Sequence, residues 1–103
     1  MIEIITEHPL DTLEYLIKDQ LNALRQDNLK KLEYLVDQTK PILEQISKTD
    51  ILSRPENKQK TEKLRDLTRN LELAMMGKKE NFKQQLDRVS EGKKLLSKYS
   101  NAI

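Results

Sequence analysis

The side chains that most often carry out chemistry in proteins are few in this sequence. It has one histidine, His8, and no cysteine among its 103 residues. Disulfides, zinc fingers, iron–sulfur clusters and thiol catalysis are therefore excluded for this chain. A functional histidine needs a second ligand or an orienting partner, and none is evident near His8. We expect His8 to be an exposed residue where a helix begins.

The carboxylates are spread along the chain at helical spacing. Glu33 and Asp37 lie four residues apart, as do Asp87 and Glu91, which places each pair on one face of a helix. A di-metal helical bundle would need Glu-x-x-His on paired helices, and this pattern is absent. No glycine-rich loop precedes a helix, so no phosphate cradle is present. We expect no metal, no cofactor and no enzymatic activity.

Two groups of residues could contact another macromolecule. The first is a basic cluster formed by Lys58, Lys60, Lys63, Arg65 and Arg69. It lacks the interleaved aromatic rings on which single-stranded nucleic acids stack. We interpret it as a solvated helix face, with an acidic protein partner as the alternative.

The second group lies in the last third of the chain. Met75 and Met76 precede Gly77, and methionine side chains repack easily on promiscuous binding surfaces, although they also fill ordinary cores. Residues 86–99 are strongly amphipathic, with lysines on the polar side. This stretch is either the last core helix or part of a groove for a partner's amphipathic helix.

The elements that position these residues must be helices. Hydrophobic residues make up 36% and charged residues 35%, with only 2 glycines and no tryptophan, a composition typical of long helices or coiled coils and not of β-sandwiches or barrels. Leucine and isoleucine recur every three or four residues. This pattern predicts one helical segment at about 9–47 and another at about 55–99, separated by a polar turn.

Three interruptions qualify this pattern. Leu24 and Leu32 are eight residues apart, which indicates either a skip in the supercoil or a break between two helices at 25–28. Pro41 lies within the first segment, and we expect a kinked but continuous helix there because the apolar stripe keeps its phase. Gly77 and Gly92 reduce the rigidity of the second segment or mark the close approach of a neighbouring helix, and we expect a bend near Gly77.

The predicted fold class is all-α, as a single domain over residues 1–103. The arrangement is either an elongated antiparallel helical hairpin or a three-helix coiled-coil bundle. Two helices of about 60 Å side by side would leave one flank of each apolar stripe exposed to water. The chain should therefore divide its first segment into two helices, form a homodimer or bind a partner helix, and we expect apolar surface to remain available for a protein partner.

The charges are distributed unevenly along the chain. The formal net charge is only +2, which does not favour a nucleic-acid binder. Residues 1–52 carry 6 basic and 10 acidic side chains, whereas residues 53–103 carry 13 basic and 7 acidic ones. Opposite charges on the two halves would fix the pairing of antiparallel arms. The alternative is a basic second half that meets an acidic partner.

No targeting or membrane-spanning segment is evident. The first ten residues, MIEIITEHPL, contain no basic residue and no apolar run longer than four, unlike a secretory signal. No window approaches the ~20 apolar residues that span a bilayer. We expect an intracellular, soluble protein.

The leucine pattern as a whole resembles the FlgN-type flagellar export chaperones. The first half has Leu-x-x-Leu-Ile at 13–17, Leu-x-x-Leu at 21–24, a polar break at Asp27 and Asn28, and a lysine followed by Ile42 and Leu43. The second half has Leu-x-x-Leu-x-x-Asn-x-x-Leu-Ala at 64–74, with further leucines at 86 and 96. The related FliT-like chaperones share this layout.

The resemblance implies a cytoplasmic secretion chaperone without catalytic activity. It would bind the amphipathic C-terminal segment of an exported hook-associated subunit, prevent its premature assembly and deliver it to the export machinery. Lys93 and Lys94 would select acidic partners. The apolar strip expected to bind the partner consists of Met75, Met76, Phe82, Leu86, Val89, Leu96 and Tyr99.

Two other functions stay open at this point. A structural coiled-coil protein would self-assemble into a stable homodimer and ignore foreign peptides. A nucleic-acid-binding protein would show a steep salt dependence of its affinity. The chaperone hypothesis instead predicts tight one-to-one binding to the tail of a secreted subunit.

Overall fold

The computed structural model describes residues 8–102, with the side chains of residues 79–82, 84 and 99–102 outside the description. These residues form four α-helices: α1 (Pro9–Arg25), α2 (Leu29–Ser47), α3 (Lys58–Met76) and α4 (Lys79–Ala102). The predicted all-α class is confirmed. The helices number four and not the two or three that were predicted, and the radius of gyration of 13.7 Å matches the value of about 13 Å for a compact chain of this length.

The first segment is divided at the polar break, so the skip in the supercoil is the wrong alternative. Helix α1 begins after His8, whose Nδ1 accepts a hydrogen bond of 3.2 Å from the Leu10 amide. It ends at Arg25, and Asp27, two residues later, has a φ of 54°, the left-handed conformation that follows the end of many helices. Helix α2 then begins after Asn28, which caps it: the Asn28 side chain accepts a hydrogen bond of 3.1 Å from the Lys31 amide.

Helix α2 continues through Pro41 without a break, which confirms the predicted continuity, whereas the kink expected there stays a prediction. A short connection follows, consisting of the 3₁₀ turns η1 (Ile51–Ser53) and η2 (Pro55–Asn57). Leu52 within this connection is 1% exposed. Asn57 Nδ2 donates a hydrogen bond of 2.9 Å to the Ile51 carbonyl. The connection therefore folds back to cover one end of the bundle, where η1 contacts α4.

The single helix predicted over 55–99 is wrong. Helix α3 ends at Gly77, and α4 begins at Lys79 in a second antiparallel hairpin. Glycine is a poor helix former, and the reversal returns the apolar face of α4 to the core. Lys78 fixes the turn between α3 and α4. Its ammonium group binds the Asp27 carboxylate in the turn between α1 and α2, and it donates a hydrogen bond of 3.3 Å to the Leu24 carbonyl at the end of α1.

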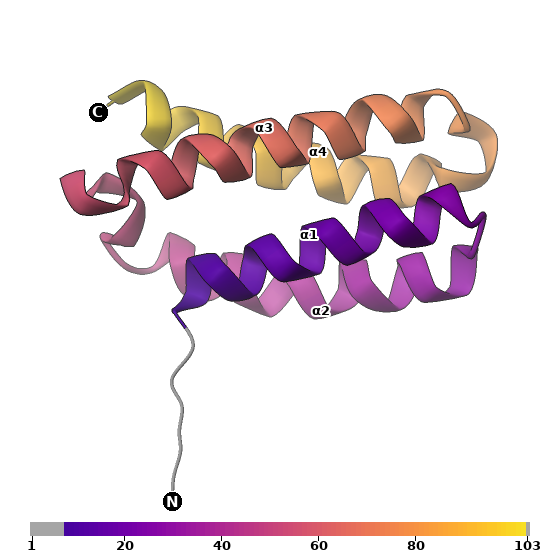
Figure 1. Ribbon diagram of the computed structural model, residues 1–103, viewed down its shortest axis with the longest axis horizontal. Coiled ribbons are helices and arrows are strands. Elements are labelled where there is room, and N and C mark those ends of the chain that lie inside the picture. Colours follow the sequence, from indigo (N-terminus) through magenta and orange to yellow (C-terminus); the bar gives the residue numbers. More distant parts are fainter. Residues whose placement is uncertain (1–7, 103) are drawn as a thin grey trace, which may run out of the picture.

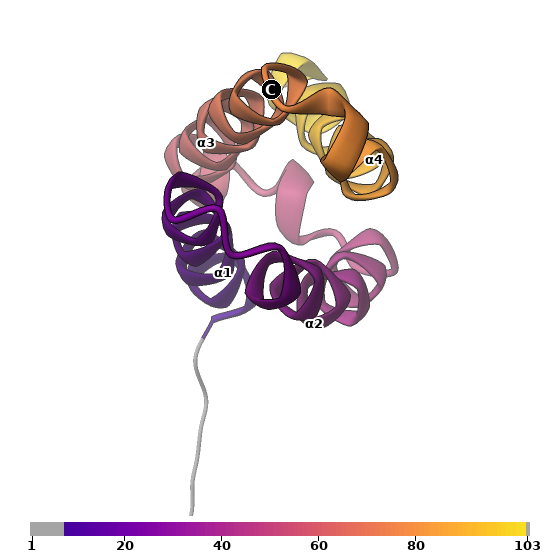
Figure 2. The same ribbon diagram turned by 90° about the vertical axis from the view of Figure 1, so that its right-hand side faces the viewer.

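The two hairpins lie side by side (Figure 1). Seen end-on, the helices follow each other in the order α2, α1, α3, α4 (Figure 2). Helices α1 and α3 are parallel neighbours, joined by ion pairs of 3.1 Å between Asp11 and Lys60 and of 3.0 Å between Glu14 and Lys63. Because α2 and α4 run back in the same direction as each other, they form the second parallel pair.

The opposite net charges of the two halves of the chain form ion pairs between the halves. The ion pairs described between the halves all join an acid of residues 1–52 to a base of residues 53–103: Asp11–Lys60, Glu14–Lys63, Asp27–Lys78 and Asp37–Arg88. The predicted attraction between the halves is therefore found, but it joins parallel helices and not the antiparallel arms that were predicted. Two members of the basic cluster, Lys60 and Lys63, thus serve the bundle itself.

Candidate partner-binding groove between helices α2 and α4

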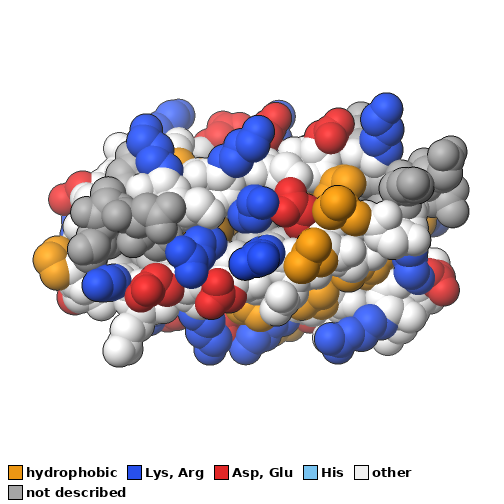
Figure 3. All heavy atoms as spheres, turned by 90° about the horizontal axis from the view of Figure 1, so that it is seen from above, with side chains coloured by type: hydrophobic (Ala, Val, Ile, Leu, Met, Phe, Trp, Pro, Cys, Tyr) orange, Lys and Arg blue, Asp and Glu red, His pale blue; other side chains and the backbone are white. Residues whose placement is uncertain are grey.

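Most of the predicted apolar strip lies inside the bundle. Met75, Val89 and Leu96 are core residues with exposures of 0%, 7% and 1%, and Leu86 is half-buried. Met76 is exposed, together with Leu73 one turn earlier. The face formed by α3 and α4 is otherwise mostly polar or charged (Figure 3). Since most of them are buried, these residues do not form one accessible strip in this conformation. The sequence could not show this, because a leucine stripe has the same spacing in a core as at a binding surface.

Phe82 and Tyr99 lie on α4, and their side chains are outside the described ones. Their predicted contact with a partner stays a prediction.

The two lysines predicted to select acidic partners differ in their surroundings. Lys94 is exposed. Lys93 forms an ion pair of 2.8 Å with Glu72 on α3, and Ser90 also donates a hydrogen bond to this carboxylate. The hydrogen bond from Lys93, which has the larger effect, and the one from Ser90 hold the pKa of Glu72 below its ordinary value. Lys93 therefore contributes to the contact between α3 and α4.

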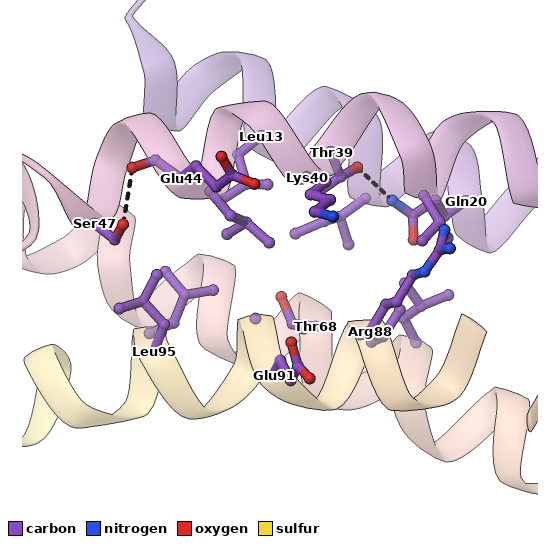
Figure 4. A pocket seen from close by; sticks show the side chains of 17 residues that line it. Leu13, Gln20, Thr39, Lys40, Glu44, Ser47, Thr68, Arg88, Glu91 and Leu95 are labelled. Atoms are coloured by element: carbon purple, nitrogen blue, oxygen red, sulfur yellow. Dashed lines mark hydrogen bonds between the residues drawn. The ribbon is translucent and has the colours of Figure 1, made fainter. Parts of the chain in front are cut away.

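An opening into the apolar core lies on the side where α2 faces α4, the most loosely packed of the four sides. A cavity of about 340 Å³ opens there (Figure 4), within the size range of about 300–1,000 Å³ that is usual for ligand sites. We call this opening the α2–α4 groove. Its aliphatic lining consists of Leu13, Ile17, Val36, Leu43, Leu71, Val89, Leu95 and Leu96.

Helices α2 and α4 approach each other closely at one point of the groove. A Cβ atom at Gly92 would lie 3.1 Å from Cδ1 of Leu43, which is shorter than ordinary van der Waals contact. The close approach expected of a glycine is therefore found at Gly92. The backbone of Gly77 has a φ of −71° and serves the turn between α3 and α4.

The floor of the groove contains a polar group. Gln20 of α1 is 1% exposed, and its Nε2 donates 2.7 Å to the hydroxyl of Thr39 on α2. Its Oε1 has no hydrogen-bond partner among the described residues. A buried acceptor left unpaired costs about 1–3 kcal/mol. Figure 4 shows this oxygen directed away from Thr39 toward the space between α2 and α4.

Charged side chains line the rim of the groove in two groups. Lys40 and Arg88 stand near the Gln20 end, and Arg88 also binds Asp37. Glu44 on α2 and Glu91 on α4 stand farther along the same opening (Figure 4). The rim thus has a cationic part and an anionic part.

Comparison with known proteins gives no further guide to the role of this groove. No family model, no curated protein and no solved structure matches the chain. Among the side chains that the structure describes, no cluster of three or more histidine, aspartate or glutamate residues could hold a metal ion. None of the helices described has both the length and the apolar character needed to cross a membrane.

The sequence contained a signal for the groove that the sequence analysis missed. Gln20 occupies the apolar face of α1, between Ile17 and Leu24 in the three–four spacing, at a position where a leucine would be expected. A buried polar residue in a leucine stripe is informative because burial is costly unless the group is paired. Leu43 and Leu95 carry no comparable signal, since nothing in the pattern separates a groove leucine from a core leucine.

Proposed function

We propose that the protein binds an amphipathic helical segment of another protein in the α2–α4 groove. The observation that carries this proposal is the groove itself, where aliphatic residues of the core meet an opening on one side of the bundle. Along α2 the lining runs from Val36 to Ser47, which at 1.5 Å per residue is about 16 Å, or three turns of a bound helix. Helix-in-groove binding uses apolar anchors at this spacing.

The client proposed is the C-terminal segment of an exported flagellar subunit of the hook–filament junction. This finer proposal is supported by the resemblance to FlgN-type and FliT-like chaperones and by a bundle that leaves one apolar side open. A chaperone of this kind would act in the cytoplasm, keep the client's amphipathic segment from assembling and release it at the export machinery. It would need no catalytic group.

The test is a titration of the purified protein with recombinant C-terminal segments of junction subunits from the same bacterium, followed by calorimetry. We expect one-to-one binding, and we expect Leu43→Asp to weaken it at least ten-fold because it places a charge in the apolar lining. The matched control is Tyr34→Asp, an apolar-to-acidic change on α2 at a side chain that is 62% exposed and outside the groove lining. Circular dichroism should show both variants folded.

Two results would contradict the proposal. One is no binding of any junction segment by the folded protein. The other is equal loss of binding in Leu43→Asp and Tyr34→Asp, which would place the contact elsewhere. If light scattering instead shows a stable homodimer that Leu43→Asp converts to monomer, the groove joins two copies of this chain and the self-assembly alternative holds.

A further inference from the structure

Gln20 is held in one orientation by its neighbour in the groove floor. The Thr39 hydroxyl donates its hydrogen to the Leu35 carbonyl over 2.8 Å, so it can only accept from Gln20. The amide nitrogen of Gln20 must therefore face Thr39, and the oxygen must face the groove. The oxygen is an acceptor that lies at the bottom of an apolar cavity and is 1% exposed as part of its side chain.

None of the neighbouring donors in the groove is hydrogen-bonded to this oxygen. The hydroxyl of Thr68, on the α3 side of the floor, donates 2.7 Å to the Leu64 carbonyl. Arg88 at the rim binds the Asp37 carboxylate. Lys40 and the remaining N–H groups of Arg88 stand at the rim and do not reach Gln20 Oε1, so a donor that enters the groove finds this acceptor free.

The surroundings restrict what that group can be. Aliphatic side chains such as Ile17, Leu71 and Val89 line the groove around the amide. The side chain that enters should therefore be apolar and carry one hydrogen-bond donor. Tryptophan and tyrosine meet this description because each combines a large apolar ring with a single N–H or O–H that requires a partner when buried. Both are also common anchors of helical segments at protein interfaces.

We propose that the α2–α4 groove recognises a tryptophan or tyrosine on the client's amphipathic helix, whose N–H or O–H donates to Gln20 Oε1. This inference rests on the proposed function and makes Gln20 the residue that determines specificity. The rim adds charge complementarity: an acidic residue of the client meets Lys40, and a basic residue one or two turns away meets Glu44 and Glu91. No ion pair is described for these three rim side chains within residues 8–102.

A matched pair of small aromatic probes tests the acceptor. Indole carries the N–H, and benzothiophene has the same shape with sulfur in its place. In NMR titrations of the full chain, indole should shift the side-chain amide signal of Gln20 and bind about five-fold more tightly than benzothiophene, which corresponds to one net hydrogen bond of about 1 kcal/mol. In Gln20→Met this preference should disappear while both probes still bind.

A second pair of probes tests the occupant. Two helical peptides of fourteen residues carry, at the centre of the apolar face, either tryptophan or benzothienylalanine, with glutamate and lysine placed on either side of it. We expect the tryptophan peptide to bind about five-fold more tightly to the wild type and equally to Gln20→Met. Circular dichroism and an unchanged affinity for benzothiophene verify that Gln20→Met keeps the groove.

Several outcomes would overturn the inference. Equal affinity of indole and benzothiophene for the wild type, or a preference that survives in Gln20→Met, would show that Oε1 does not select the ligand. Selective indole binding without selective peptide binding would reject the helical occupant. If junction segments bind and require Leu43 but ignore Gln20→Met, this inference fails and the proposed function stands. If the tryptophan peptide binds selectively and no junction segment binds, the assignment of the client fails alone.

Discussion

The two contacts between the hairpins differ although both join parallel helices. Between α1 and α3, which pack against each other, buried leucines such as Leu10 and Leu64 belong to the core, and Glu14 reaches Lys63 across the surface. Between α2 and α4, the helices meet closely at Gly92 and Leu43 and leave a cavity of about 340 Å³. We call the first contact the closed seam and compare it with the α2–α4 groove.

Charge placement is one cause of this difference. On the closed seam, acids of α1 stand beside bases of α3, and the pKa of Glu14 lies below its ordinary value because Lys18 and Lys63 donate hydrogen bonds to it. On the groove, Asp37 and Arg88 form one ion pair between α2 and α4, and Glu44 and Glu91 place two acids on opposite edges of the opening (Figure 4). Opposite charges stabilise a contact between helices, whereas like charges do not. Among the side chains described, the closed seam thus has two ion pairs, whereas the groove side has one ion pair and a pair of like charges.

The largest expected effect contrasts one leucine from each side. Leu64→Ala removes a side chain that is 1% exposed and outside the groove lining, and it should lower the free energy of unfolding by about 3 kcal/mol. Leu95→Ala removes a half-buried side chain at the groove, where water already reaches, and should cost about 1 kcal/mol. Urea denaturation of both variants measures the difference.

Equal losses in the two variants would contradict the comparison, since they would mean that the groove is closed in solution. Leu95→Ala should also leave the denaturant dependence of unfolding unchanged. The reason is that little additional surface is exposed when a half-buried side chain is shortened.

The next effect concerns the polar floor of the groove. Gln20→Met replaces the unpaired amide oxygen by an apolar group of similar length, and Thr39 keeps its hydrogen bond to Leu35. We expect the free energy of unfolding to rise by about 1 kcal/mol, because removal of the unpaired buried acceptor outweighs the loss of the hydrogen bond from Gln20 Nε2 to Thr39. Thermal unfolding in the absence of any ligand measures this gain. A loss of stability would show that the oxygen already has a partner in solution.

The sequence predicts those parts of the structure that depend on local interactions and not those that depend on contacts between distant residues. Helix starts at Pro9 and after Asn28 could be predicted because capping and proline act locally. The reversal at Gly77 could not, since Lys78 fixes it through Asp27 and Leu24, more than fifty residues earlier in the chain. A glycine alone is compatible with a bend or with a turn.

The candidate site was less predictable than the fold. The amphipathic pattern identified α4 as an element that could line a groove, and Val89 and Leu96 do line it. The opposite wall comes from α2, and the choice of neighbour is decided by how two hairpins pack. Periodicity within one helix shows which face is apolar, but it does not show which apolar face is left uncovered.

A smaller effect tests the contact between α3 and α4 with pH. Glu72 has a pKa below its ordinary value because of Lys93 and Ser90. A depressed pKa in the folded state gives stability that is present above the pKa of the unfolded chain, about 4.3, and lost as the pH falls through the folded value. Glu72→Gln should lower stability by about 1 kcal/mol at pH 7, because the charge-assisted hydrogen bonds are weakened.

Urea denaturation of Glu72→Gln and the wild type at pH 7 and at pH 3 measures this dependence. The two proteins should differ at pH 7 and converge at pH 3. A difference that persists at pH 3 would assign the effect to packing and not to charge.

The smallest effects should differ in sign between the closed seam and the groove. Asp11→Asn removes the exposed ion pair with Lys60 and should cost about 0.3 kcal/mol. Glu44→Gln removes one of the two acids on the groove rim and should stabilise the protein by about the same amount, since it relieves repulsion between like charges. Both changes should shrink in 1 M salt, where screening acts within about 3 Å. Thermal unfolding at low and high salt measures them. If both substitutions changed stability in the same direction, charge placement would not explain why one contact is closed and the other open.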